Sequence, residues 1–298
     1  MSREAHPALP EFDYVKPGTL KEASKFLAEH AGEARPLSGG TDTFVRMRDG
    51  VWKDKFLVDV KGLDGTKELT FDAKQGLTIG AAVPMNRISA MPEVKKHYPL
   101  LAEACNTVAA YQLRSRATVV GNICNASPAG DTIGACLLYQ GELNVHGVKG
   151  ERKEALNTFF KGPGQTKLQP GDVVVSLHLP PPPKGMVGKY IKHGRNNRGD
   201  LAIVGITAIA YPDKDLSSGT RVQLALASVA PVPLLVDQVE KYFTENKLNE
   251  ANIKAAAKLA MDACKPIDDV RASARYRKMM VRNLTNKALT AVWEKLDK

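Results

Sequence analysis

The sequence predicts an α+β protein made of two lobes. Its 298 residues exceed what one hydrophobic core usually organises, and 43% hydrophobic against 25% charged residues allow a sizeable core. Helical and strand-like patterns occur in both halves of the chain. Between them, the run from Pro180 to Gly185 cannot form regular structure. We therefore expect one domain over residues 1–182 and a smaller one over residues 183–298.

The first domain begins with a small parallel unit over about residues 1–62. Thr19 and Glu22 form a capping box, and apolar residues follow at helical spacing. Phe56 to Val60 is a short apolar run typical of a buried strand. The loop from Pro36 to Thr43 then lies at a strand-to-helix turn, where the positive end of the helix favours phosphate.

The rest of the first domain, about residues 63–182, mixes strands and helices. Leu77, Ile79 and Ala81 alternate as a strand. Other segments follow the same kinds of pattern, with helices expected at residues 102–110 and 131–139 and strands at residues 143–146 and 173–179.

In the second domain, three strand-like stretches precede three helices. The strands are expected at residues 189–193, 202–211 and 221–230. The last helix starts near Arg271, and its apolar residues recur every four positions among basic ones. We expect that stripe to be core: Tyr276, Met280, Leu284, Ala288, Val292 and Leu296.

Two loops of small residues carry the main functional signal, one from Pro36 to Thr43 and one from Thr118 to Asp131. A diphosphate needs several backbone N–H donors close together, and small residues let the main chain approach it. Neither loop has the lysine of a Walker loop or the spaced glycines of a Rossmann turn. This argues against ATP hydrolysis and an ordinary nicotinamide domain, although each loop alone is also typical of a plain turn.

The chain is basic, with 42 Lys and Arg against 32 Asp and Glu. Such a balance fits nucleic acid, an anionic surface, an acidic partner subunit or an anionic cofactor pocket. Nucleic-acid binding is disfavoured because aromatic residues make up only 6% and do not interleave with a basic stripe.

Cysteine and histidine patterns give no metal or catalytic site. The cysteines lie too far apart for a zinc or iron-sulfur motif, so reduced thiols in a cytoplasmic protein are expected at Cys105, Cys124, Cys136 and Cys264. The histidines have no recurring catalytic partner nearby, so no acid-base residue is assigned among His97, His146, His178 and His193. The segment from Met1 to Glu11 lacks the features of a signal peptide, and no membrane span is expected.

Several sequence stretches in and around the loops resemble those of one protein family. The stretches PLSGGTDTFVRMR, QLRSRATVVGNICNASPAGDTIGACLL and IDDVRASARYRKMMVRNL occur in order. From about Phe12 to its end, the chain resembles the FAD-binding medium subunit of the molybdenum hydroxylases, which include xanthine dehydrogenase and carbon monoxide dehydrogenase. The resemblance implies an α+β fold: a two-subdomain FAD-binding domain of the vanillyl-alcohol-oxidase (PCMH) type, then a smaller α+β domain with a three-stranded antiparallel sheet and helices.

The resemblance also implies an FAD site on this chain. One wall would hold the diphosphate with Pro36, Leu37, Ser38, Gly39, Gly40, Thr41, Asp42 and Thr43. The opposite wall would use Thr118, Val119, Val120, Gly121, Asn122 and Ser127. Val120 departs from the family's glycine, and a β-branched residue is strained at positive φ, so a difference in loop shape is expected if that conformation is required.

Other positions follow from the same resemblance. Asp131 would accept hydrogen bonds from the cofactor, cap a helix, or do both. Val108 would lie near the adenine or ribose. Lys192 would approach the pyrimidine end of the flavin, or be an exposed strand lysine. Leu201 would pack on the ring face with Val174 or Val175 beside it, although each is also typical of ordinary core.

The implied function is electron transfer. A molybdopterin-type molybdenum cofactor in a large partner and 2Fe-2S clusters in a small partner would feed FAD here, in a dimer of heterotrimers, and an external acceptor such as NAD or a quinone would take the electrons. The substrate stays open among purines, aldehydes, N-heterocycles, aromatic thioesters and carbon monoxide. The alternative is a non-catalytic basic assembly subunit that keeps the fold without flavin, favoured by Val120 and the charge of +10.

Overall fold

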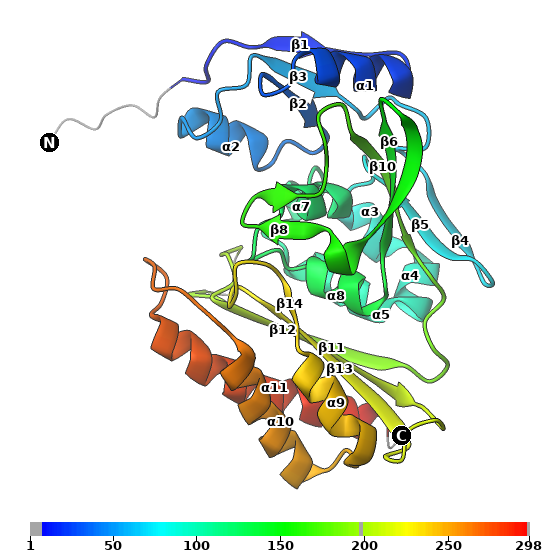
Figure 1. The fold of residues 1–298 in the computed structure, drawn as a ribbon, viewed down its shortest axis with the longest axis vertical. Coiled ribbons are helices and arrows are strands. Elements are labelled where there is room, and N and C mark those ends of the chain that lie inside the picture. The colour runs from blue at the N-terminus through cyan, green and yellow to red at the C-terminus, as the bar shows by residue number, and fades with distance from the viewer. Residues whose placement is uncertain (1–7, 197–198, 297–298) are drawn as a thin grey trace, which may run out of the picture.

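A parallel three-stranded sheet opens the computed structural model, which describes residues 8–196 and 199–296 (Figure 1). Its strands lie in the order β1-β3-β2. The elements of this unit are β1 (Asp13–Val15), α1 (Leu20–Glu29), β2 (Ala34–Leu37), α2 (Thr43–Arg48) and β3 (Phe56–Asp59). One half of the predicted capping box forms, because Thr19 Oγ1 accepts from the N–H of Glu22 at 3.1 Å. In the other half, Glu22 Oε2 accepts from the N–H of Gly18 at 2.8 Å, one residue before the cap.

A five-stranded antiparallel sheet follows, in the order β4-β5-β10-β6-β7. Its strands are β4 (Leu69–Asp72), β5 (Gly76–Gly80), β6 (Glu142–Gly147), β7 (Gly150–Ala155) and β10 (Val173–Leu179). Its helices are α3 (Met85–Ala90), α4 (Pro92–His97), α5 (Pro99–Thr107), α6 (Tyr111–Arg114), α7 (Val119–Asn125) and α8 (Ile133–Leu138). A 3-10 turn η1 (Leu156–Thr158) leads to the small hairpin of β8 (Phe160–Gly162) and β9 (Gln165–Thr166).

Two helix boundaries differ from the sequence-based expectation. The helix expected over residues 102–110 is α5, which ends at Thr107 because Val108 is extended and Ala109 has a φ of 40°. The helix expected over residues 131–139 begins only at Ile133, with Thr132 before it, so Asp131 stays outside.

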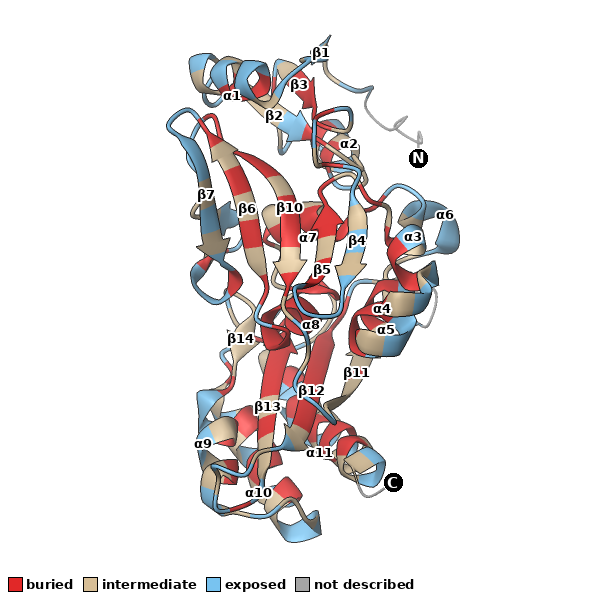
Figure 2. Cartoon of the chain, turned by 90° about the vertical axis from the view of Figure 1, so that its right-hand side faces the viewer, coloured by how far each residue is buried: buried red, intermediate tan, exposed pale blue. Residues whose placement is uncertain are grey.

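The second lobe is a four-stranded antiparallel sheet covered by three helices. Its elements are β11 (Val187–His193), β12 (Val204–Pro212), β13 (Thr220–Ala227), β14 (Leu234–Leu235), α9 (Asp237–Glu245), α10 (Glu250–Ala263) and α11 (Ala274–Leu296). The two-residue β14 adds to the three expected strands by pairing with β13. Helices α9 and α11 contact one face of the sheet, and α5 and α8 of the first lobe contact the other. Residues 204–210 of β12 and 224–227 of β13 are therefore buried on both faces (Figure 2).

The stripe expected on α11 packs against the core except at its first residue. Ala288 and Val292 are buried, and Met280, Leu284 and Leu296 are partly buried against the core of the second lobe. Tyr276 is 41% exposed, because side chains four apart drift by about 40° around a helix of 3.6 residues per turn. The fully buried positions of the helix are Arg277, Val281, Thr285, Ala288, Leu289 and Val292.

Two further properties concern the whole chain. In residues 8–196 and 199–296, no helix has both the length and the apolar character needed to cross a bilayer. All four cysteines are free thiols. Residues 1–7 of the segment analysed for a signal peptide, and Asn197 and Arg198 of the stretch that contains Lys192, lie outside the described residues.

Candidate functional site

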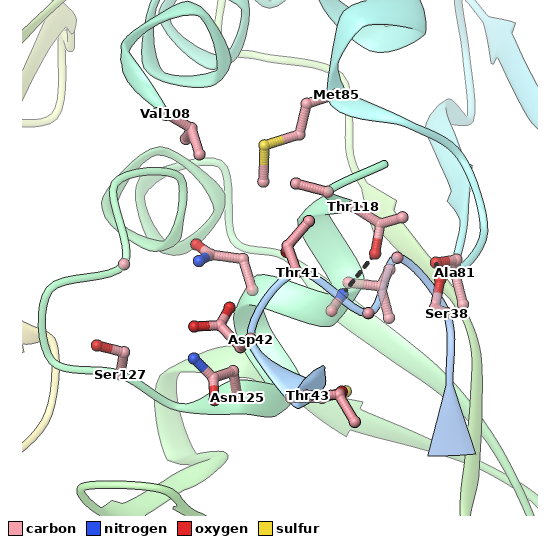
Figure 3. A pocket seen from close by; sticks show the side chains of 18 of the residues that line it. Ser38, Thr41, Asp42, Thr43, Ala81, Met85, Val108, Thr118, Asn125 and Ser127 are labelled. Atoms are coloured by element: carbon pink, nitrogen blue, oxygen red, sulfur yellow. Dashed lines mark hydrogen bonds between the residues drawn. The ribbon is translucent and has the colours of Figure 1, made fainter. Parts of the chain in front are cut away.

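A cavity of about 480 Å³ lies where the two small-residue loops meet (Figure 3). Its volume falls in the range of small-molecule and cofactor sites. Segments near each of the three larger sheets contribute to it: the loop after β2, the segment from Thr118 to Asp131, the start of β10, and residues of the second lobe near Lys192 and Leu201. The site is thus assembled from segments far apart in the sequence.

The first loop, between β2 and α2, presents a row of backbone donors. Among the interactions of residues 8–196 and 199–296, the N–H groups from Gly39 to Asp42 donate to no acceptor. The loop is held from behind, because Ser38 Oγ donates to the carbonyl oxygen of Ala81 at 2.8 Å. Gly40 has a φ of 75°, a backbone conformation that residues with a side chain rarely adopt. Four free amides at the edge of a cavity form a binding place for an anion.

The two loops touch at Gly39. A Cβ atom added there would clash with the backbone carbonyl oxygen of Arg116, closer than real Cβ atoms come to any atom. Arg116 lies two residues before the second loop. Glycine at position 39 is therefore what allows the two walls to close on each other.

The second loop begins with a helix turn, α7, rather than an irregular stretch. Thr118 Oγ1 caps it by accepting from the N–H of Gly121 at 2.9 Å. Val120 is helical and 2% exposed, and from Thr118 to Asn125 no residue has positive φ. The expected strain at Val120 therefore does not arise. This removes one of the two observations that favoured a flavin-free assembly subunit.

Asp131 and Lys192 form a shielded ion pair at the cavity. Lys192 Nζ lies 2.8 Å from Asp131 Oδ2, and their side chains are 14% and 7% exposed. Lys192 also donates to the carbonyl oxygen of Thr107 at 3.1 Å, and the hydroxyl of Tyr190 donates to Asp131 Oδ1 at 2.7 Å. Burial raises the pKa of Asp131, against the lowering effect of Lys192. Asp131 does not cap α8, whose N-cap is Thr132, and Lys192 is too buried to be an exposed strand lysine.

Most of the candidate residues are brought to the cavity wall. Those that line it are Pro36, Ser38, Gly39, Gly40, Thr41, Asp42, Thr43, Val108, Thr118, Val120, Gly121, Asn122, Ser127, Asp131, Val174, Lys192 and Leu201. Leu201 is 58% exposed, so it is not core, whereas Val174 is 7% exposed and belongs to the wall.

Three candidates do not line the cavity. Leu37 packs in a small core with Met47 and Leu57, and Val119 packs in the main core of the first lobe. Val175 lies next to Gly65, and the register of β10 shifts at this point, between Val174 and Ser176. Each carries a side chain that the packing of its own element directs away from the cavity.

Other lining residues were missed by the sequence analysis. Arg35 lies 3.6 Å above the ring of Trp52, and Met85 and Val108 lie together at one end of the cavity in Figure 3. Asn125 Oδ1 is buried and has no partner within the described residues. Asn125 belongs to the expected second loop, and Arg35 directly precedes the first loop, so both could be found by position. Trp52 and Met85 reach the site through folding alone.

Comparison with known proteins decides the family. A model of the FAD binding domain in molybdopterin dehydrogenase matches residues 10–182, and one of the carbon monoxide dehydrogenase flavoprotein C-terminal domain matches residues 189–292. The chain belongs to the FAD-binding medium subunits of the xanthine dehydrogenase and carbon monoxide dehydrogenase family. It is thus a subunit of an oxidoreductase, with an α+β fold and an FAD-binding domain.

Relatives within the family match over nearly their whole length. The glyceraldehyde dehydrogenase medium chain of Sulfolobus acidocaldarius is 30% identical, covering 95% of this chain and 99% of that one. The xanthine dehydrogenase FAD-binding subunit of Escherichia coli O157:H7 is 28% identical, covering 93% and 94%. A chain of carbon monoxide dehydrogenase from Hydrogenophaga pseudoflava superposes with a TM-score of 0.91 at 26% identity, covering 97% of this chain and 99% of that one.

The cavity fits the FAD that the family implies. A diphosphate needs the donors that Gly39 to Asp42 leave free, and the glycines keep that stretch of main chain open to it. A flavin ring needs apolar contacts and a few polar groups, which Val174, Leu201 and Lys192 offer. The unpartnered Asn125 Oδ1 is an acceptor still to be satisfied.

Proposed function

We propose that this chain takes electrons from 2Fe-2S clusters of a small partner subunit and passes them, through FAD bound in the cavity, to an external acceptor such as NAD or a quinone. The observation that carries the proposal is the single cavity lined by both glycine loops and by Lys192 and Leu201. By binding FAD, the chain would fix the position at which electrons arrive and leave.

The same proposal includes the rest of the complex. Relatives are named medium chains, and the matching Hydrogenophaga structure is described as a carbon monoxide dehydrogenase that lacks the Mo-pyranopterin moiety of its molybdenum cofactor. This supports a large molybdenum-cofactor subunit and a small iron-sulfur subunit as partners, in a dimer of heterotrimers. Four free thiols suit the cytoplasm. Residues 1–182 would form the FAD-binding domain and residues 183–298 the C-terminal domain.

Each wall has a distinct role in this proposal. The free amides from Gly39 to Asp42 would hold the diphosphate, with Thr118 to Asn122 opposite. Val108 would lie at the adenine or ribose. Val174 and the exposed Leu201 would cover the flavin ring, because an apolar side chain that is 58% exposed at a cavity gains by burial against a ring.

Lys192 supplies a fixed positive charge. When bound, FAD supplies redox chemistry that couples single-electron and two-electron partners. Lys192 is held by Asp131 at 2.8 Å and by the carbonyl oxygen of Thr107, so its ammonium group does not need to reorganise when negative charge develops at the pyrimidine end. Asp131, in turn, keeps the charge of Lys192 compensated inside a low-dielectric wall.

The test uses the native complex, purified without oxygen. Candidate purines, aldehydes, N-heterocycles, aromatic thioesters and carbon monoxide are added in turn until one reduces the iron-sulfur clusters. The proposal expects the visible absorption of the flavin to bleach with that substrate and to return on adding NAD or a quinone. A complex whose clusters become reduced while its flavin absorption stays unchanged would overturn the proposed route.

A further inference from the structure

The segment that leads into α11 forms a rigid turn with a fully exposed tip. The N–H of Asp269 donates to the carbonyl oxygen of Ala272 at 3.2 Å. The Asp269 carboxylate accepts from the N–H of Arg271 at 2.8 Å and from the guanidinium groups of Arg271 and Arg277, each at 2.6 Å. At the tip, between these bonded residues, Val270 is 97% exposed. The turn is thus preorganised to present an apolar side chain.

The same network ties the turn to the cavity wall. Arg277, 1% exposed, donates to the carbonyl oxygens of Ile203 at 3.0 Å and Ser228 at 2.8 Å. Arg271 donates to the carbonyl oxygen of Ala202 at 3.4 Å. Ala202 and Ile203 directly follow Leu201, which lines the cavity. A partner that holds the turn is therefore held beside the cofactor site.

Exposed apolar residues cluster in this stretch of sequence. Besides Val270, Ile267 is 68% exposed, and Tyr276 and Met279, one turn apart on α11, are 41% and 44% exposed. Tyr276 is fixed by a hydrogen bond between its hydroxyl group and His193 Nε2, at 2.9 Å. Such a concentration of exposed apolar side chains marks a contact surface for another molecule.

The surface is also positively charged. Lys265, Arg275, Lys278 and Arg282 are all exposed, and none forms an ion pair with any residue in the described ranges. The exposed carboxylate of Asp268 caps α11 by accepting from the N–H of Ala274 at 2.6 Å. An apolar centre with an uncompensated basic rim is complementary to an apolar pocket edged by carboxylates.

We propose that residues 265–282 form the docking surface for the partner subunit that delivers electrons, and that this subunit meets it with an apolar pocket ringed by acidic residues. The inference rests on the proposed function, because it takes its occupant from the electron route. The turn is hydrogen-bonded to the residues that follow Leu201. A subunit that binds Val270 is therefore placed next to the cavity, where electrons would be delivered.

The test measures iron and flavin in the complex purified through a tag on this chain. Flavin reports this chain, and iron reports the bound iron-sulfur subunit. Val270→Asp and Lys278→Glu should lower the iron-to-flavin ratio, the former about tenfold or more because a central apolar anchor is replaced by a charge. Val148→Asp and Lys149→Glu are matched controls, since both residues are exposed in the turn between β6 and β7, and should keep the wild-type ratio.

The outcomes separate the two proposals. An unchanged ratio in Val270→Asp, or an equal loss in Val148→Asp, overturns the docking surface. A wild-type preparation that contains iron but no flavin, with iron lost in Val270→Asp, supports the docking surface and contradicts the proposed function. A wild-type preparation without iron overturns both. The flavin content of each variant shows that its chain has folded.

Discussion

Gly39 is the residue on which the closure of the cavity depends most. Replacing it with alanine places a Cβ atom against the rigid backbone oxygen of Arg116, so the two loops must part. We expect Gly39→Ala to lose most bound FAD and about 1–3 kcal/mol of unfolding free energy, as overpacking does. Gly62→Ala is the control, because a Cβ there meets no atom within 4 Å. Equal flavin content in the two purified variants would contradict this reading of the loops.

The contribution of Lys192 to the free energy of unfolding should depend on pH. The pKa of Asp131 is raised by burial, so the folded state binds its proton more tightly than the unfolded state does. The contribution of this carboxyl is therefore fully present below its unfolded pKa and is lost as pH rises through the folded one. Lys192→Met removes the lowering partner, raises the folded pKa further and enlarges that loss.

Denaturant unfolding of Lys192→Met from acid to neutral pH measures this effect. At neutral pH we expect a loss of about 3 kcal/mol, the cost of leaving a buried charge unpaired. The loss should shrink as the pH falls below about 4, where the carboxyl becomes protonated in both states. The double variant Lys192→Met with Asp131→Asn should recover most of the neutral-pH stability. A loss that is the same at every pH would show that Asp131 is not its cause.

For single residues, the sequence predicted which residue types the site needs better than it predicted their backbone conformations and side-chain partners. Gly39 and Gly40 are recognisable because a close approach or a positive φ restricts the position to glycine. Val120 was misjudged because its φ depends on a helix turn that the small residues conceal. The pair of Asp131 and Lys192 could not be predicted, since the two residues stand 61 positions apart and meet only through the packing of the lobes.

At the scale of elements, the short helix α7 depends on its cap. Thr118 Oγ1 satisfies the N–H of Gly121, and α7 carries Val120, Gly121 and Asn122 to the cavity. We expect Thr118→Ala to cost about 1 kcal/mol of unfolding free energy and to weaken FAD retention, whereas Thr118→Ser keeps the oxygen and should do neither. Chemical unfolding with a flavin assay checks both. Similar losses in the alanine and serine variants would assign the effect to the methyl group instead.

Elements were predicted well where one pattern determined them. The strand Val173–Leu179 has the expected bounds because its apolar run lies between turn residues. The stripe on α11 was predicted correctly except at Tyr276, which is exposed because a repeat of four residues rotates slowly around the helix. Burial of the charged Arg277 in that helix has no signal in the sequence, since Asp269 and two backbone carbonyls compensate it only in the fold.

At the scale of the whole molecule, the site belongs to no single part. The parallel unit supplies the free amides, α7 supplies the opposite wall, and the second lobe supplies Lys192 and Leu201. These parts lie in different regions of the ribbon in Figure 1. The two-lobe architecture could be predicted from the proline run and the order of elements. The contact between the lobes, with α5 and α8 against the second sheet, could not, because it depends on shape complementarity between distant surfaces.

The central claim is that this chain binds FAD between the two glycine loops. Its most direct test is a calorimetric titration of the flavin-free chain with FAD, run in parallel for the wild type, Gly39→Ala and Gly62→Ala. We expect one saturable site per chain in the wild type and in Gly62→Ala, with affinity at least about tenfold weaker in Gly39→Ala, a difference of 1.4 kcal/mol. Wild-type chain that shows no saturable binding, or Gly39→Ala that binds as tightly as the wild type, would contradict it.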